Sequence, residues 1–310
     1  MTRATRLLIV GSSGFVGGHT VRAAARHPQV ELRLARRQRR SPAPGEPRLK
    51  TVHADLNAPE TLHGLCADVD ALIHCASAIT GSEEELHRVN DLGTRALVDE
   101  AVRCGVRRIV YVSTASVYGR GTFRAARAAE LTPAPLSPTS RTRAAAERHV
   151  LESGGTVLRP HLVHGQGDRW MIPGTVQLLR ALRGNVAGAG LQSLVPVTAL
   201  AAAAVAAALT ADDLAGAHHV SHPYPVSGAQ LTAAVADQVG LPQGPLLDLA
   251  EARARLADSP VGLHHLAMLS TDHWFADEGL WDRLGCDPGR GFLEDLPDQA
   301  PWYREFLGRP

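Results

Sequence analysis

Regularly spaced glycines follow the first apolar stretch of the chain and could hold a phosphate group. The apolar run Leu7–Val10 leads into glycines at 11, 14 and 17, and a helical pattern begins near Phe15. Gly11 permits a tight turn, Gly14 lets the backbone approach a pyrophosphate, and Gly17 lets helix and strand pack closely. The free N–H groups of the helix start favour an anion. The spacing therefore indicates a site that binds the diphosphate of a dinucleotide. The alternative is that the strand-to-helix turn needs these glycines for steric reasons alone.

Arginines end the second predicted strand, Val30–Ala35, where this architecture recognises the cofactor ribose. An acidic residue there would bind a ribose 2′-hydroxyl, whereas arginine pairs with a 2′-phosphate. No acidic residue ends this strand, so NADPH is favoured, with Arg36 as the first candidate and Arg37 as the second. A solvated basic loop is the alternative. The basic run continues with Arg39 and Arg40 and leads into a proline-rich segment at 41–47.

Further candidate cofactor contacts stand at the ends of later strands. Asp55 and Leu56 are placed to contact an adenine, and Cys75, Ala76 and Ser77 leave room for a dinucleotide. Successive strand–helix units with right-handed crossovers predict an α/β fold with a Rossmann doubly wound parallel sheet. Such sheets bind ligands at the carboxyl ends of their strands. The strand patterns are Lys50–Ala54, Ala71–Cys75 and Arg107–Val112, and Glu83–Cys104 has the pattern of one long helix.

Composition excludes several classes of function. The 310 residues suffice for two domains or one large α/β unit, and 45% hydrophobic residues can form a sizeable core. A net charge of +1 does not favour nucleic acid or an anionic membrane as a partner. The cysteines lack CxxC spacing, so we expect neither a metal site nor a disulfide framework, and a cytoplasmic protein. We expect no membrane or targeting segment; the alanine-rich run 199–209 is too short to span a bilayer.

The fifth strand leads into VSTASVYG, and from there the chain resembles the extended short-chain dehydrogenases/reductases. This resemblance implies that Thr114 is the active-site hydroxyl, with Ser113 and Ser116 as neighbours, and that Tyr118 is structural. It also implies cofactor contacts from Pro160 and Val163. The motifs that carry it are the glycine turn, ADL at 54–56, IHCAS at 73–77, VNDLGT at 89–94, VSTASVYG at 112–119, LRPHLVHG at 158–165, VPVTALAAA at 195–203 and LGCDP at 284–288.

The family's Tyr-x-x-x-Lys pair is missing. The matching stretch runs from Ser137 to Arg143 and puts Thr139 at the tyrosine position and Arg143 at the lysine position. A threonine hydroxyl is too weak an acid to protonate an alkoxide near neutral pH. Arginine keeps its charge and can still bind ribose hydroxyls. Cofactor binding is therefore expected to survive, whereas ordinary proton transfer is not.

Two interpretations remain open. The chain could be an inactive NADP-binding sensor or scaffold. It could instead transfer hydride to a ketone that needs no enzyme acid, because a neighbouring phenol on the substrate stabilises the alkoxide.

The later part of the chain favours an apolar substrate over a sugar nucleotide, because no dense basic cluster occurs at 166–194. Trp170, Met171 and Ile172 could form an apolar wall, with core packing as the alternative. His161 is the reserve candidate for an acid.

These features together resemble the atypical ketoreductases of angucyclinone (simocyclinone) tailoring. That resemblance implies NADPH-dependent reduction of an aromatic polyketide ketone, a small-molecule partner, and leaves the oligomeric state open. We predict an NADP-binding domain at 1–165 plus about 195–220, interleaved with a smaller substrate domain at 166–194 plus 221–310. The predicted cofactor residues are Gly11, Ser13, Gly14, Phe15, Val16, Gly17, Arg36, Arg37, Asp55, Leu56, Cys75, Ala76, Ser77, Arg143, Pro160 and Val163; the predicted catalytic ones are Thr114, Ser116, Thr139 and Arg143; the predicted substrate contacts are Ser113, Ser116, His161, Trp170 and Met171.

Overall fold

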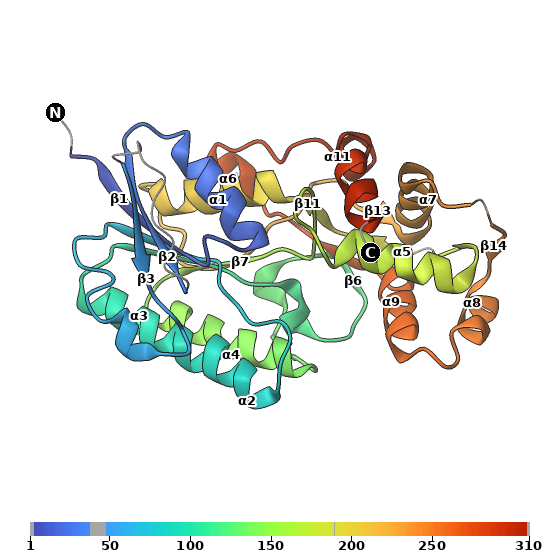
Figure 1. Cartoon of the computed structure of the whole chain (residues 1–310), viewed down its shortest axis with the longest axis horizontal. Coiled ribbons are helices and arrows are strands. Elements are labelled where there is room, and N and C mark those ends of the chain that lie inside the picture. Colours follow the sequence, from blue (N-terminus) through green and yellow to red (C-terminus); the bar gives the residue numbers. More distant parts are fainter. Residues whose placement is uncertain (1–2, 38–47, 189, 243, 309–310) are drawn as a thin grey trace.

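A seven-stranded parallel sheet forms the larger part of the molecule, on the left in Figure 1. The computed structural model describes residues 3–37, 48–188, 190–242 and 244–308. The strand order is β12-β7-β5-β4-β1-β2-β3, which reverses between β1 and β4 and confirms the predicted doubly wound sheet. That reversal opens a crevice at the carboxyl ends of the strands. The strands are β1 (Thr5–Val10), β2 (Val30–Arg36), β3 (Leu49–His53), β4 (Ala71–His74), β5 (Arg108–Val112), β7 (Thr156–Arg159) and β12 (Gly216–His219).

Helices cover both faces of the sheet, which explains why Leu7–Val10 of β1 is apolar at every position. Leu7 and Ile9 of β1 join a core under α1 (Phe15–Ala25) and α6 (Val197–Leu209). Leu8 and Val10 point the other way, into a core with α3 (Gly93–Arg103) and α4 (Pro138–Glu152). Successive strand residues face opposite sides, so burial on both faces requires a continuous apolar run.

The expected single helix over 83–104 is wrong, because a π-helical turn interrupts it. α2 (Glu83–Leu86) passes into the π turn η2 (His87–Leu92) before α3 begins. Asn90 in this turn is buried, and its side chain bonds both the N–H and the carbonyl of Ala78, at 2.7 and 2.8 Å. Its amide also donates to Thr142 Oγ1 at 3.0 Å. The turn therefore fastens the loop after β4 to α4.

A second core lies beside the sheet, at its carboxyl edge (Figure 1). It is built largely by α5 (Met171–Leu182), α7 (Gly228–Val239), α9 (Pro260–Ser270) and α11 (Phe292–Leu307). A four-stranded sheet of order β13-β10-β15-β6 joins this core to the main sheet. The interleaved domain boundaries stay a prediction. The remaining elements are η1 (Pro59–Leu62), η3 (Ala115–Tyr118), β6 (Phe123–Ala126), η4 (Ala128–Glu130), β8 (Leu162–His164), β9 (Asn185–Val186), β10 (Leu191–Gln192), β11 (Leu194–Pro196), β13 (Val226–Ser227), β14 (Leu246–Leu247), α8 (Leu249–Arg255), β15 (His273–Phe275) and α10 (Leu280–Leu284).

Within the described ranges, none of the helices has the length and hydropathy needed to cross a bilayer. The same ranges contain no group of three or more His, Cys, Asp or Glu side chains arranged to hold a metal ion.

Candidate active site

The glycine turn after β1 has the geometry of a pyrophosphate cradle. Gly11 has φ +83°, and a Cβ there would lie 2.6 Å from the Ala76 nitrogen. A Cβ on Gly17 would lie 2.0 Å from the Gly11 carbonyl oxygen, so only glycine allows α1 to pack this closely on the turn. Gly14 caps α1 without any side-chain hydrogen bond, which leaves the first N–H groups of the helix for a ligand. The turn therefore fits the diphosphate of a dinucleotide.

Arg36 stands at the carboxyl end of β2, beside this cradle. Its Nε donates to Ser12 Oγ at 3.3 Å, and Ser12 lies in the glycine turn itself. Arg36 is half-buried, whereas Arg37 is exposed. The contact with Ser12 holds the Arg36 guanidinium next to the turn, where a ribose phosphate of the same dinucleotide would lie. Arg39, Arg40 and the segment 41–47 lie outside the described residues.

The residues that follow β3 and β4 form another part of the crevice at the carboxyl edge of the sheet. Leu56 is 6% exposed, and its backbone packs against Gly93, where a Cβ would lie 2.5 Å from the Leu56 carbonyl oxygen. Asp55 lies beside it, with its Oδ1 accepting from the Asn57 N–H at 3.0 Å. Burial raises the pKa of the Cys75 thiol to about 12, so this cysteine is a small neutral group in the crevice wall.

Arg143 occupies the position that the sequence assigns to the family's lysine. Its Nη1 donates to Ser77 Oγ at 2.9 Å and its Nη2 to the Val112 carbonyl at 2.6 Å. The guanidinium lies over the ring of Tyr111, 5.6 Å from its centre. A fixed positive charge therefore stands between the carboxyl ends of β4 and β5, where it can face a ribose and the reacting oxygen of a substrate.

The hydroxyl groups near this arginine form no proton-donating pair. Thr139 Oγ1 reaches only the Ile79 carbonyl, at 3.4 Å. Thr114 Oγ1 donates to Ser116 Oγ at 3.2 Å and accepts from the Ser116 N–H at 3.1 Å. Ser113 is 3% exposed, and its Oγ has no hydrogen-bond partner within the described residues. Serine and threonine hydroxyls are weak acids, so none of these groups supplies a strong acid at neutral pH.

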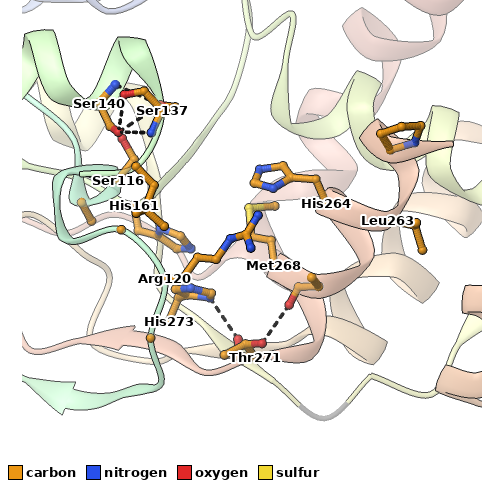
Figure 2. Close-up of a pocket in the computed structure, with 16 residues that line it drawn as sticks. Ser116, Arg120, Ser137, Ser140, His161, Leu263, His264, Met268, Thr271 and His273 are labelled. Carbon is orange, nitrogen blue, oxygen red and sulfur yellow. Dashed lines mark hydrogen bonds between the residues drawn. The ribbon is translucent and has the colours of Figure 1, made fainter. Parts of the chain in front are cut away.

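A cavity of about 840 Å³ opens beside Thr114, at the carboxyl ends of β5 and β7 (Figure 2). Its first wall comes from η3 and the start of α4, its floor from the small sheet, and its opposite wall from α9. This volume suits a drug-sized ligand. The lining residues are Ala115, Ser116, Gly119, Arg120, Gly121, Leu136, Ser137, Ser140, His161, Pro260, Leu263, His264, Ala267, Met268, Thr271 and His273.

His161 lies at the floor of the cavity, as expected for a substrate contact. Burial, assisted by the charge of His273, lowers its pKa to about 3. Its Nε2 is 3.2 Å from Gln192 Oε1, and its ring stacks on that of His273 with centres 5.1 Å apart. The imidazole is therefore neutral near pH 7, which argues against its reserve role as an imidazolium acid.

Trp170 and Met171 are absent from the cavity lining, so the expected apolar wall does not come from them. These residues instead open a helix, because α5 begins at Met171. The Asp168 carboxylate accepts the N–H groups of Trp170, Met171 and Ile172 at 2.7 to 2.9 Å and so starts the helix. Ile172 is fully buried and Met171 packs on the same core, while Trp170 is 61% exposed.

Tyr118 is structural, as the sequence predicted. It is 3% exposed, and its hydroxyl accepts from Arg159 Nη1 at 2.8 Å and lies 2.7 Å from His219 Nε2. Arg159 is itself paired with Glu147 at 2.5 Å, and both are almost fully buried.

Pro160, the next residue, accepts the Ala115 N–H at 2.8 Å and so holds η3 beside β7. Val163 packs against the core under α6.

Two buried histidines make the folded state sensitive to acid. His74 and His164 are each 1% exposed, and burial lowers the pKa of each from 6.5 to about 3. The unfolded chain therefore binds more protons between these values, and stability is lost as the pH falls from 6.5 towards 3. We expect the free energy of unfolding to fall between pH 7 and pH 5 by at most about 1.4 kcal/mol per pH unit for each histidine.

Urea unfolding at pH 7.5, 6.0 and 5.0 measures this slope. His74→Asn should flatten it, since asparagine has no group that titrates there. An unchanged slope in the variant would show that His74 does not contribute.

The comparisons with known proteins agree with this geometry. The model of the NAD dependent epimerase/dehydratase family matches residues 7–221, which include the glycine turn, Thr114 and Arg143. The chain belongs to this family. Its motifs resemble those of the extended short-chain dehydrogenases/reductases.

Curated relatives are named as reductases and dehydrogenases. The chain is 27% identical to the 2-alkyl-3-oxoalkanoate reductase of Stenotrophomonas maltophilia, over 94% of this chain and 97% of that protein. It is 27% identical to the 4-hydroxy-2-methyl-3-oxo-4-farnesyl-3,4-dihydroquinoline-1-oxide ketoreductase of Stigmatella aurantiaca, over 57% of this chain and 56% of that protein. The chain thus spans little more than half the length of the Stigmatella relative. It likewise spans 57% of the length of a yeast sterol-4-alpha-carboxylate 3-dehydrogenase.

Among solved structures, Bordetella bronchiseptica WbmH in complex with NAD⁺ matches 98% of this chain with a TM-score of 0.78 and 20% identity. A UDP-glucuronic acid 4-epimerase from Bacillus cereus, in complex with NAD, matches with a TM-score of 0.77 and 16% identity. These likenesses show that the fold is shared.

Sequence reasoning missed the wall that α9 contributes and the cation at Arg120. The sequence pattern of 260–270 is that of any half-buried helix. It does not show which of the apolar residues pack into the core and which line a cavity. Arg120 directly follows the VYG triplet, and a charged residue next to a site motif was a usable signal.

Proposed function

We propose that the chain is an NADPH-dependent ketoreductase that converts a carbonyl of a polycyclic aromatic polyketide, of the angucyclinone type, to a secondary alcohol. The observation that carries this proposal is a fixed cation, Arg143, between the carboxyl ends of β4 and β5, together with a large cavity lined by Ala115 and Ser116, the two residues that follow Thr114. The hydroxyl groups described near Arg143 include no strong acid. Bound NADPH supplies the hydride in such a reaction. The relatives named as ketone reductases support the reaction class.

The residues of the cradle hold the cofactor in this proposal. The Gly11–Gly17 turn and the N–H groups that start α1 bind the diphosphate, and Arg36 binds the 2′-phosphate. Arg143 binds ribose hydroxyls and keeps a positive charge near the reacting oxygen. These contacts place the nicotinamide against the cavity, which supplies the orientation that hydride transfer requires.

The substrate lies in the cavity, with its rings along the apolar side chains of α9. Leu263, Ala267 and Met268 suit a flat apolar body, and the hydroxyl groups of Thr114 and Ser116 can accept or donate a hydrogen bond near the carbonyl. The proton comes first from the substrate itself: a phenol at the peri position hydrogen-bonds to the carbonyl oxygen and would pass its proton to the alkoxide as it forms. The resulting phenolate would regain a proton from solvent, so the proton that the reduction consumes comes ultimately from water. Thr139 takes no part in proton transfer.

The direct test is oxidation of NADPH with a panel of peri-hydroxy polycyclic ketones, followed at 340 nm with identification of the alcohol. Turnover with members of the panel supports the ketoreductase. Tight NADPH binding without turnover on any of them would favour the inactive NADP-binding sensor. A cytoplasmic location, a single small-molecule partner and the open oligomeric state remain predictions.

The preference for NADPH depends on Arg36. We expect Arg36→Ala to weaken NADPH binding by about 10- to 100-fold, because one charge-assisted contact to the phosphate is lost. NADH lacks that phosphate, so its affinity should change little and serves as the internal control. Fluorescence titration of both nucleotides measures this, and Arg37→Ala should have the smaller effect. Equal affinities of the wild-type protein for NADPH and NADH would contradict the assignment.

A further inference from the structure

Arg120 is an unpaired cation that lines the substrate cavity and is exposed to solvent at its edge. It follows η3 directly after Gly119, and Figure 2 shows its side chain reaching into the cavity towards His264 and Met268 of α9. Within the described part of the chain, its guanidinium makes no hydrogen bond or ion pair, although most arginines near the site do. An arginine that points into a cavity with all its donors free is positioned to bind a ligand.

The rest of the lining leaves this charge uncompensated. No aspartate or glutamate is among the described residues that line the cavity. His161 and His273 have pKa values lowered chiefly by burial, so both imidazoles are neutral near pH 7. The cavity therefore carries a net positive charge at neutral pH from Arg120. A field of one sign inside a cleft with low-dielectric walls attracts a ligand of the opposite charge.

The shape of the cavity separates the apolar and the charged parts of such a ligand. The α9 side of the cavity is apolar and is lined by Pro260, Leu263 and Ala267. The opposite side, formed by η3 and the start of α4, is polar and is lined by Ser116, Ser137 and Ser140. Ser137 and Ser140 bond to each other and to the start of α4, so their hydroxyl groups are largely occupied. Arg120 is thus the strongest free polar group that a ligand of this cavity meets.

We propose that Arg120 is a specificity-determining residue that binds a carboxylate carried by the aromatic substrate, away from the carbonyl that is reduced. This inference rests on the proposed function for the aromatic body of the ligand. The planar guanidinium binds a carboxylate through two parallel N–H···O bonds, which also fixes the orientation of the rings along α9. A neutral ligand of the same shape gains the apolar contacts alone.

Binding of two matched probes tests this without turnover. Anthraquinone-2-carboxylate and anthraquinone-2-carboxamide have the same rings and differ in charge, and saturating NADP⁺ keeps the site loaded but unable to donate hydride. Calorimetry should show the carboxylate binding about 10- to 100-fold more tightly than the amide to the wild-type protein. Arg120→Gln should bring the carboxylate to the affinity of the amide and leave the amide and NADP⁺ affinities unchanged. Arg120→Lys should restore part of the preference.

Arg148→Gln is the matched control, because Arg148 is exposed on α4 and does not line the cavity. It should bind both probes as the wild-type protein does. Equal affinity of the wild-type protein for both probes, or no binding of either, overturns the proposal. So does an equal loss for both probes in Arg120→Gln, since that result indicates stacking on the rings. Absence of ketone reduction contradicts the proposed function alone, because this measurement involves no turnover.

Discussion

Gly17→Ala is expected to abolish NADPH binding, whereas Gly18→Ala, at the next residue of the same helix, leaves it nearly unchanged. A Cβ on Gly17 would lie 2.0 Å from the Gly11 carbonyl oxygen, so α1 or the turn must move away. A Cβ on Gly18 meets its nearest atoms at 3.9 Å, which is ordinary contact. The loss of aligned N–H groups should weaken NADPH binding by more than about 100-fold, as expected when several charge-assisted bonds are lost together.

Fluorescence titration with NADPH measures both variants, and far-ultraviolet circular dichroism checks that each is folded. Gly18→Ala controls for the general effect of a methyl group on α1. Tight NADPH binding by a folded Gly17→Ala protein would show that the cofactor does not sit on this turn.

Glu147→Ala should strongly destabilise the folded protein. Glu147 is 1% exposed and bonds the guanidinium of Arg159, which is 4% exposed. Removal of the carboxylate leaves a buried, uncompensated cation, which costs about 3–5 kcal/mol. Glu152 lies on the same helix and is exposed, so Glu152→Ala should change stability by less than about 0.5 kcal/mol. Urea unfolding at pH 7.5 compares the two, and similar midpoints would contradict this role of the pair.

The sheet could be predicted because local pattern alone determines its strands. Leu7–Val10 is apolar at every position, and only a strand buried on both faces requires that. The π turn at His87–Leu92 could not be predicted. Its Asn90 side chain bonds to Ala78, in the loop after β4, and this is a tertiary contact that local sequence pattern does not show. The sequence gives a helical pattern on both sides of the turn and no signal for its pitch.

The cofactor half of the candidate site follows from the sequence, and the substrate half does not. Gly11, Arg36 and Arg143 come from motifs that stand next to strand ends, and the fold brings strand ends together. The cavity wall comes instead from α9, which meets η3 only through the packing of the second core. Trp170 and Met171 differ from this case, because the sequence held a usable signal: Asp168 is a helix start residue, and the helix that it begins carries both side chains away from the cavity.

The central claim is that ketone reduction here needs no acid from the protein, and one substrate pair tests it. kcat and KM are measured for a peri-hydroxy polycyclic ketone and for its methyl ether, with NADPH and the wild-type protein. The account predicts that the methyl ether still binds, with KM or inhibition constant changed by less than about tenfold, while kcat falls by at least about 100-fold, the usual contribution of a proton donor. Equal kcat values for the two ketones would contradict this claim. They would indicate that a protein group such as Thr114 donates the proton.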